Sequence, residues 1–171
     1  MDGLAFLDVH YDGDAARCAC VVATDWTAEV PKLEFTVDRL GVAPYVSGAF
    51  FEREFPSLIA AIDELQHRGV DASCLVVDGY VLLDADERPG LGWHLWQHYG
   101  GRYAVVGIAK TAFSGNTAAI PVTHGGSIRP LFVTAIGVDP AEIAEAVKRM
   151  PGPHRLPTLV ARADRLSRSA G

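Results

Sequence analysis

The sequence predicts an α/β protein in which a mixed sheet is covered by helices on both faces. Three strand-like segments with short connections open the chain, and short connections favour antiparallel pairing. A helical segment then leads into residues 72–77, a nearly continuous apolar run. Such a run is typical of a strand buried on both faces, and the helix before it provides the crossover that a parallel strand needs. Strands and helices continue from there, as expected of a mixed sheet between helical layers.

The first three strands form an antiparallel meander in this prediction. They are expected at residues 3–11, 17–24 and 29–38. Asp12-Gly13 is a hairpin turn signal between the first two. Cys18 and Cys20 are two residues apart and share one strand face, which favours core packing over redox or metal chemistry.

An aromatic stretch, residues 44–56, separates the third strand from the first helix and carries Glu52 and Glu54 near its end. We expect Pro56 in the first turn of that helix, where its missing N–H has no cost. Gly69 then ends the helix. The simpler interpretation is a packing element with aromatic side chains in the core and two solvated glutamates.

The second half of the chain continues the same alternation. Further strands are expected at residues 103–108, 118–123 and 128–136, the last two as a hairpin, and further helices at 92–99, at 139–150 and up to about 167. Asp139 to Glu142 has the pattern of a capping box. Without a repeat or a linker, residues 1–171 are predicted to form a single domain.

Composition limits the function classes. Of 171 residues, 49% are hydrophobic and 21% charged, the balance of a globular protein. No apolar run is long enough to cross a bilayer and no signal pattern opens the chain, so we expect a cytoplasmic location and no membrane partner. A net charge of −6 argues against coating nucleic acid by bulk attraction. Basic residues nevertheless gather after residue 148, which suits either a polyanion beside a metal site or a solvated helix.

Two acids lie at awkward positions in strands. Asp8 shares strand parity with Leu4 and Phe6, and Asp78 closes the buried strand after the crossover. If those two strands are parallel neighbours, both carboxylates approach each other at one sheet edge, where they repel unless a cation lies between them. Oxygen ligands of this kind suit Mg²⁺ or Mn²⁺ rather than zinc.

Other charged candidates are individually weak. Lys110 follows the next buried strand, where a fixed positive charge would meet a phosphate or an oxyanion. Asp164 by itself is typical of a surface acid in a salt-bridged helix. His94 and His98 have helical spacing but lack the glutamate of a zinc protease motif, so zinc is not expected there.

Taken in order, these residues resemble the endonuclease V family. The matching segments run through nearly the whole chain: Phe6-Leu7-Asp8-Val9-His10-Tyr11, Pro44-Tyr45-Val46-Ser47-Gly48, Arg53-Glu54-Phe55-Pro56, Val77-Asp78-Gly79, Gly107-Ile108-Ala109-Lys110, Arg129-Pro130-Leu131-Phe132-Val133 and Arg155-Leu156-Pro157 with Ala163-Asp164.

The resemblance implies a ribonuclease H-like fold and Mg²⁺-dependent hydrolysis of a phosphodiester 3′ to a deaminated base such as inosine, in DNA or RNA. The residues that it implies as catalytic are Asp8, Glu54, Asp78, Lys110 and Asp164, with Asp8, Glu54 and Asp78 as the metal ligands. It further implies Tyr45 as a wedge that fills the base stack and Gly48, Gly79 and Gly107 as substrate-binding positions.

The chain also departs from the family pattern. Ser47 replaces a proline of the wedge, and Tyr80 to Arg88 replaces a segment that normally carries two histidines. Ala135-Ile136-Gly137 stands where Gly-His-Arg is usual. Two alternatives therefore stay open: a nuclease for another nucleic acid, and a catalytically silent nucleic-acid-binding protein on the same scaffold. The oligomeric state is not indicated by the sequence.

Overall fold

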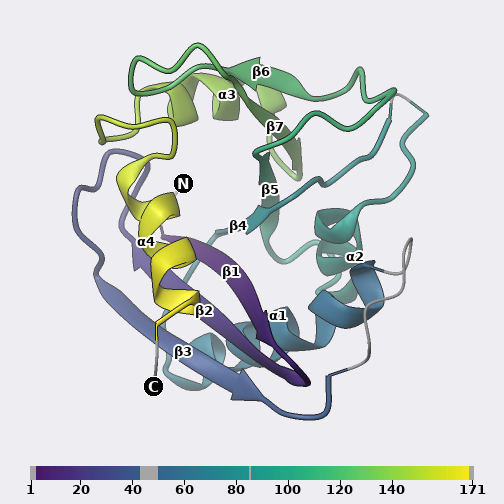
Figure 1. Cartoon of the computed structure of the whole chain (residues 1–171), viewed down its shortest axis with the longest axis vertical. Coiled ribbons are helices and arrows are strands. Elements are labelled where there is room, and N and C mark those ends of the chain that lie inside the picture. The colour runs from purple at the N-terminus through teal and green to yellow at the C-terminus, as the bar shows by residue number, and fades with distance from the viewer. Residues whose placement is uncertain (1–2, 43–49, 85, 170–171) are drawn as a thin grey trace.

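A seven-stranded sheet with the order β3-β2-β1-β4-β5-β7-β6 forms the centre of the protein (Figure 1). The computed structural model describes residues 3–42, 50–84 and 86–169. The strands are β1 (Leu4–Asp12), β2 (Ala15–Ala23), β3 (Leu33–Arg39), β4 (Cys74–Asp78), β5 (Ala104–Ala109), β6 (Ile120–Val122) and β7 (Leu131–Ile136). β4 is parallel to both β1 and β5, and the other neighbouring pairs are antiparallel, so the predicted mixed sheet is confirmed.

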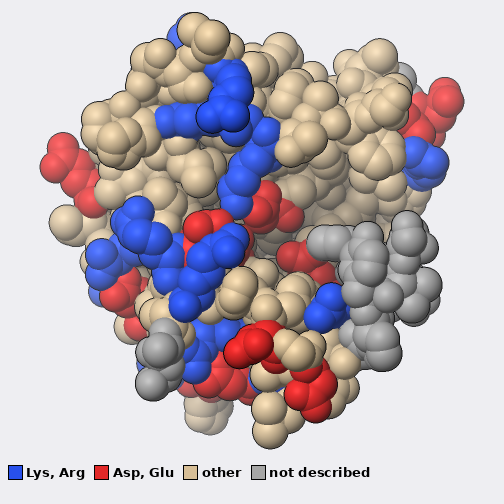
Figure 2. All heavy atoms as spheres, in the orientation of Figure 1, with Lys and Arg blue, Asp and Glu red and all other residues tan. Residues whose placement is uncertain are grey.

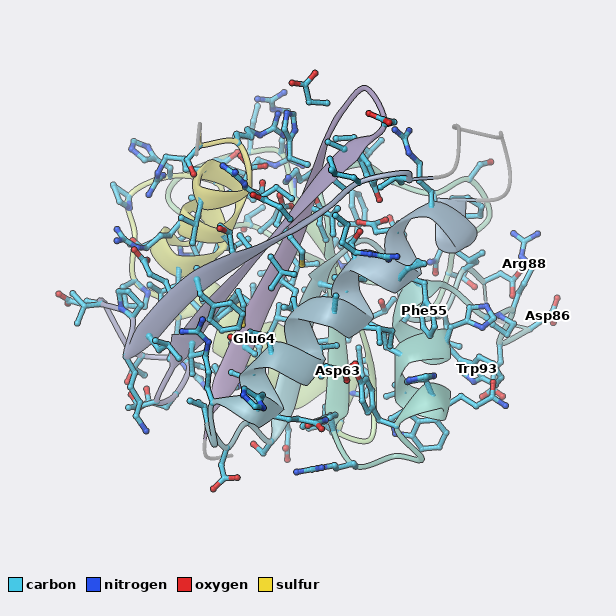
Figure 3. The ribbon with its side chains drawn as sticks, turned by 90° about the horizontal axis from the view of Figure 1, so that it is seen from below. Phe55, Asp63, Glu64, Asp86, Arg88 and Trp93 are labelled. Carbon is cyan, nitrogen blue, oxygen red and sulfur yellow. The ribbon has the colours of Figure 1, made fainter. Side chains whose placement is uncertain are left out.

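Helices cover both faces of this sheet, as predicted. They are α1 (Phe50–His67), α2 (Leu91–His98), α3 (Pro140–Lys148) and α4 (Thr158–Ser167). Leu4 and Phe6 of β1 belong to the core under α3 and α4, whereas Ala5 and Leu7 belong to the core under α1 and α2. This alternation is the period of two expected of a strand buried on both faces. Seen from below, α1 and α2 lie side by side, and the Phe55 ring meets the His98 ring edge to face at 5.4 Å (Figure 3).

Two element boundaries differ from the sequence prediction. The first helix begins at Phe50, so Pro56 lies inside it rather than in its first turn, and Glu54 belongs to the helix itself. Pro56 withholds one backbone hydrogen bond, but the turn before it is held by packing, because the Arg53 guanidinium stacks 4.0 Å from the centre of the Tyr11 ring. The third strand begins at Leu33 rather than at residue 29, since Pro31 cannot donate to a strand ladder.

Several smaller predictions are confirmed. Cys18 and Cys20 are both buried in the core under α1 and α2. β6 and β7 form the late hairpin. Asp139 caps α3, and its carboxylate accepts a hydrogen bond from the Ala141 N–H at 2.8 Å. Within the described part of the chain, no helix has the length and apolar content needed to cross a membrane.

The parallel strands bring the predicted acids to one edge of the sheet. Leu7 of β1 pairs with Val77 of β4, so the residues that follow them, Asp8 and Asp78, are neighbours across the strand pair. Asp78 is in register with Ile108 of β5, and Lys110 follows just beyond that strand. By strand parity these three side chains leave the sheet on the side covered by α4.

Candidate active site

Asp8 is a nearly buried carboxylate that the last helix holds in place. It is 9% exposed, and the hydroxyl of Ser167, itself 1% exposed, donates a hydrogen bond to its Oδ2 at 2.5 Å. The same hydroxyl oxygen lies 2.9 Å from the main-chain oxygen of Asp164. Burial raises the pKa of Asp8, the Ser167 hydrogen bond lowers it, and the charge of Asp78 raises it again.

Glu54 approaches the same region from the opposite side of the sheet. It is 8% exposed near the start of α1 and has no hydrogen bond or ion pair with the described residues. Burial, followed by the charges of Asp78 and Asp8, raises its pKa from 4.5 to about 8. These couplings show that the three carboxyl groups from β1, α1 and β4 share one electrostatic environment.

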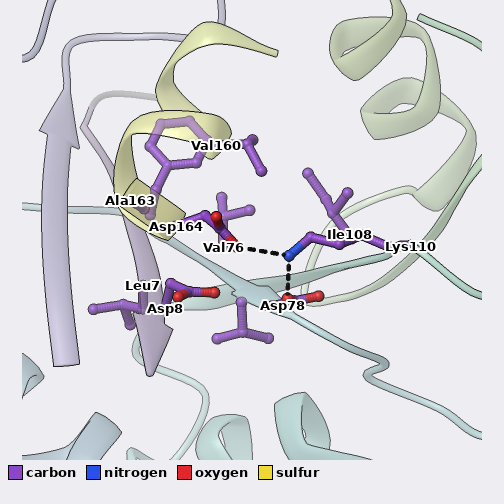
Figure 4. A pocket seen from close by; sticks show the side chains of 11 residues that line it. Leu7, Asp8, Val76, Asp78, Ile108, Lys110, Val160, Ala163 and Asp164 are labelled. Atoms are coloured by element: carbon purple, nitrogen blue, oxygen red, sulfur yellow. Dashed lines mark hydrogen bonds and ion pairs between the residues drawn. The ribbon is translucent and has the colours of Figure 1, made fainter. Parts of the chain in front are cut away.

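Lys110 lies between the carboxylates of Asp78 and Asp164 (Figure 4). Its Nζ is 2.7 Å from Oδ2 of Asp78 and 3.0 Å from Oδ1 of Asp164. Burial lowers the pKa of Lys110, but the hydrogen bonds and charges of Asp78 and Asp164 outweigh burial and raise it. Burial likewise opposes ionisation of Asp164, whereas hydrogen bonds from Arg168 and Lys110 bring the net pKa of that carboxyl below its ordinary value. The lysine is therefore a fixed cation within the acidic group.

Four acids, Asp8, Glu54, Asp78 and Asp164, are the candidate ligands for a divalent cation. The donors are all carboxylate oxygens, which suits Mg²⁺ or Mn²⁺, and the buried carboxyl group of Glu54 has no basic partner in the described part of the chain. In the described residues, however, no three carboxylate, imidazole or thiolate groups are close enough together to hold one metal ion. The chemistry of the donors thus suits a divalent cation. In this structure the Lys110 ammonium forms ion pairs with two of them, Asp78 and Asp164.

Arg155 fixes the backbone on which Lys110 stands. Its Nη2 donates to the main-chain oxygen of Lys110 and, at 2.7 Å, to that of Pro130. One guanidinium group thereby ties the end of β5 to the start of β7 and to the segment that leads into α4. The position of the lysine consequently depends on three elements that are distant in sequence.

The predicted glycine positions differ in their surroundings. A Cβ on Gly107 would lie 2.5 Å from the main-chain oxygen of Gly79 and 2.9 Å from Oγ1 of Thr134, so packing alone requires a glycine there. Gly79 has a φ of +128° and open space around it. Tyr45 and Gly48 lie outside the described residues.

Sequence reasoning missed Ser167 and the bracing role of Arg155. Ser167 continues the buried stripe of Leu159 and Ala163 at intervals of four residues. A hydroxyl in such a stripe needs a polar partner, which was the signal in the sequence for a buried acid nearby. The partner itself, Asp8, lies 159 positions away and is given only by the packing of α4 against β1.

Comparisons with known proteins show the family to which the chain belongs. A sequence model of the endonuclease V family matches residues 2–151. Endonuclease V of Streptomyces coelicolor is 33% identical over 148 residues, which cover 85% of this chain but only 58% of that protein. This chain therefore spans less than two thirds of the length of that relative.

Solved structures show the same fold. Human ENDOV superimposes with a TM-score of 0.79 at 22% identity, covering 98% of this chain and 83% of that one. Ciona intestinalis endonuclease V, in complex with a 24mer DNA that contains an inosine followed by a ribo-adenosine, gives a TM-score of 0.79 at 17% identity and covers 98% and 84% of the two chains. The expected ribonuclease H-like fold is confirmed.

Proposed function

Because the chain belongs to the endonuclease V family, we propose that it is a metal-dependent endonuclease that hydrolyses the phosphodiester 3′ to a deaminated base such as inosine. The observation that carries this proposal is the pairing of Asp78 and Asp164 with Lys110, beside the buried carboxyl groups of Asp8 and Glu54, which are coupled electrostatically to Asp78. The inosine-containing DNA bound by the Ciona protein supports the choice of substrate.

In this proposal Asp8, Glu54 and Asp78 hold Mg²⁺ or Mn²⁺, and Asp164 completes the acidic group. When bound, the cation would supply an activated water and charge neutralisation at the phosphate and the leaving 3′ oxygen. Asp8 is oriented for this role by the Ser167 hydroxyl. Lys110, already charged and fixed by Arg155, steadies a non-bridging phosphate oxygen in exchange for its contacts with the carboxylates.

Recognition of the base is assigned to Tyr45, Gly48, Gly79 and Gly107. Tyr45 and Gly48 lie outside the described residues, and in this proposal Tyr45 fills the stack after the altered base leaves it. Gly79 directly follows Asp78 and has room for a base to approach the backbone. Gly107 contributes by allowing the Gly79 carbonyl to pack closely against β5.

The second candidate is a silent nucleic-acid-binding protein on this scaffold. One observation favours it: the Lys110 ammonium forms ion pairs with both Asp78 and Asp164. A lysine that never leaves these carboxylates would fill the place where a cation has to act, while the surrounding basic surface would still bind a strand.

One experiment separates the two candidates. Labelled DNA and RNA strands, with and without a single inosine, are incubated with the protein and Mg²⁺ or Mn²⁺, and Mn²⁺ binding is titrated separately by calorimetry. We expect inosine-dependent cleavage that Asp8→Asn abolishes, with Mn²⁺ binding weakened. Glu145→Gln, which removes an equal charge from an exposed position on α3, is the matched control. Strand binding without cleavage or Mn²⁺ uptake would establish the silent alternative.

A further inference from the structure

The connection between β6 and β7, residues 123–130, presents an apolar and a basic side chain to solvent. Ile128 is 93% exposed and Arg129 beside it is exposed as well. At the base of the same connection His124 is only 5% exposed. The connection is therefore anchored at the buried His124 and exposed at its tip, Ile128 and Arg129.

Contacts of this connection keep its tip in place. The His124 ring nitrogens lie 2.6 Å from the main-chain oxygen of His154 and 2.8 Å from that of Met150. A Cβ on Gly125 would lie 2.2 Å from the His154 oxygen, so the two backbones are in close contact. Above the anchor, Ser127 N–H donates to the His124 carbonyl at 3.1 Å and its Oγ accepts from Arg129 N–H at 3.2 Å. These contacts fix the turn in a conformation that leaves Ile128 exposed.

Single exposed apolar residues are common on protein surfaces and do not by themselves indicate a binding site. At Ile128 a binding site is therefore inferred from the charge beside it. Arg129 forms no ion pair within the described part of the chain. By contrast, Arg162 and Arg168 on α4 are bound to Glu34 and Asp164. Arg129 is thus a positive charge beside Ile128 that no acid in the described part of the chain neutralises.

This connection is continuous with the candidate active site. Arg155 Nη2 joins the main-chain oxygens of Lys110 and Pro130, so the residue after Arg129 is two hydrogen bonds away from Lys110. Figure 2 shows basic side chains running across this face to the acids in the central hollow. A strand whose phosphate lies at Lys110 would reach the tip within the next few nucleotides.

We propose that the Ile128-Arg129 tip is a nucleic-acid contact, in which Arg129 binds a phosphate and Ile128 packs against a base of the same strand. The inference rests on the proposed function for the placement of that strand at Lys110. Apolar side chains beside basic ones are a recurring means of wedging bases, and arginine binds phosphate with little regard to sequence. DNA and RNA strands share this chemistry, so both are used in the test.

The test measures binding in EDTA, where cleavage does not occur. Fluorescence anisotropy follows oligonucleotides at several salt concentrations, and a 2-aminopurine next to the inosine reports unstacking. Arg129→Ala should reduce the slope of log K against log salt by about 0.9 for a duplex. Ile128→Ala should weaken binding about fivefold with the slope unchanged, and should lower the 2-aminopurine signal. Val30→Ala, at a 74% exposed valine, and Arg102→Ala, at an exposed arginine after α2, are the matched controls.

The outcomes separate this inference from the proposed function. If both tip variants bind and report like the wild type, the inference is overturned, whether or not the protein cleaves inosine strands. If no strand is cleaved under any condition but the tip variants lose binding as described, the inference stands and the nuclease proposal fails. Thermal unfolding of each variant excludes a loss that comes from misfolding, because both side chains are exposed and their removal should leave the melting temperature unchanged.

Discussion

Glu54 is a buried acid whose ionised form is disfavoured both by burial and by neighbouring negative charges. Its carboxyl group is 8% exposed and its pKa is raised from 4.5 to about 8 by burial and by Asp78 and Asp8. Between these two pH values the folded protein holds a proton that the unfolded chain releases. Without a metal ion, this group stabilises the fold fully below pH 4.5 and loses that contribution as the pH rises through 8.

We therefore predict that the melting temperature in EDTA falls between pH 5 and pH 8. Glu54→Gln, which is neutral at every pH, should flatten this decline and melt above the wild type at about pH 8. Each kcal/mol corresponds to about 2–4 °C for a domain of this size. Thermal unfolding followed by circular dichroism measures the profile, with Glu64→Gln on the surface of α1 as a control that keeps the wild-type slope. An equal pH slope in wild type and Glu54→Gln would contradict the prediction.

Among the elements, the segment between α3 and α4 depends on His124. Both ring nitrogens of this buried side chain face carbonyl oxygens, at 2.6 and 2.8 Å. These two contacts tie the β6–β7 connection to the chain that leads into α4. Helix α4 in turn supplies Asp164 and Ser167.

Replacing His124 by alanine should destabilise the protein by about 1–3 kcal/mol, since the main-chain oxygens of Met150 and His154 lose the ring that contacts them. Chemical denaturation measures this loss. His154→Ala is the control, because the contact uses its main-chain oxygen and its own ring is exposed. A loss of the same size in His154→Ala would mean that the ring contacts of His124 contribute nothing specific.

The elements also show how far the sequence leads. Strands with clear patterning were predictable, and the Asp8 and Asp78 edge follows from one inference, the parallel crossover. The start of α1 was predicted wrongly because the local sequence around a proline inside a helix resembles that of a proline in a first turn. The turn before Pro56 is stabilised by packing against Tyr11 and His98, which are distant in sequence. The bond between Ser167 and Asp8 was beyond local reasoning, since it depends on how α4 settles on the finished sheet.

For the whole molecule, the negative net charge opposes nucleic-acid binding, whereas the local distribution of basic side chains favours it. The net charge of −6 repels a polyanion at long range. The face in Figure 2 carries acids in a hollow with basic side chains around it. A strand must therefore be held by the basic rim while its phosphate approaches carboxylates. A divalent cation relieves that repulsion, and so does the removal of an acid.

This balance predicts an opposite effect of one substitution on binding and on cleavage. Asp78→Asn removes a negative charge and one of the two ion pairs of Lys110, whose ammonium lies 2.7 Å from Oδ2 of Asp78 and 3.0 Å from Oδ1 of Asp164. In EDTA and low salt the variant should bind inosine strands about fivefold more tightly than the wild type, as expected for one charge near a phosphate in a solvated site. The gain should disappear at high salt through screening, and cleavage with Mg²⁺ should be lost. Anisotropy and gel assays on the same strands measure both effects.

Glu145→Gln, with a 61% exposed side chain on α3, changes the net charge equally and should give neither effect. A similar gain in Glu145→Gln would assign the repulsion to net charge rather than to the carboxylates at the sheet edge.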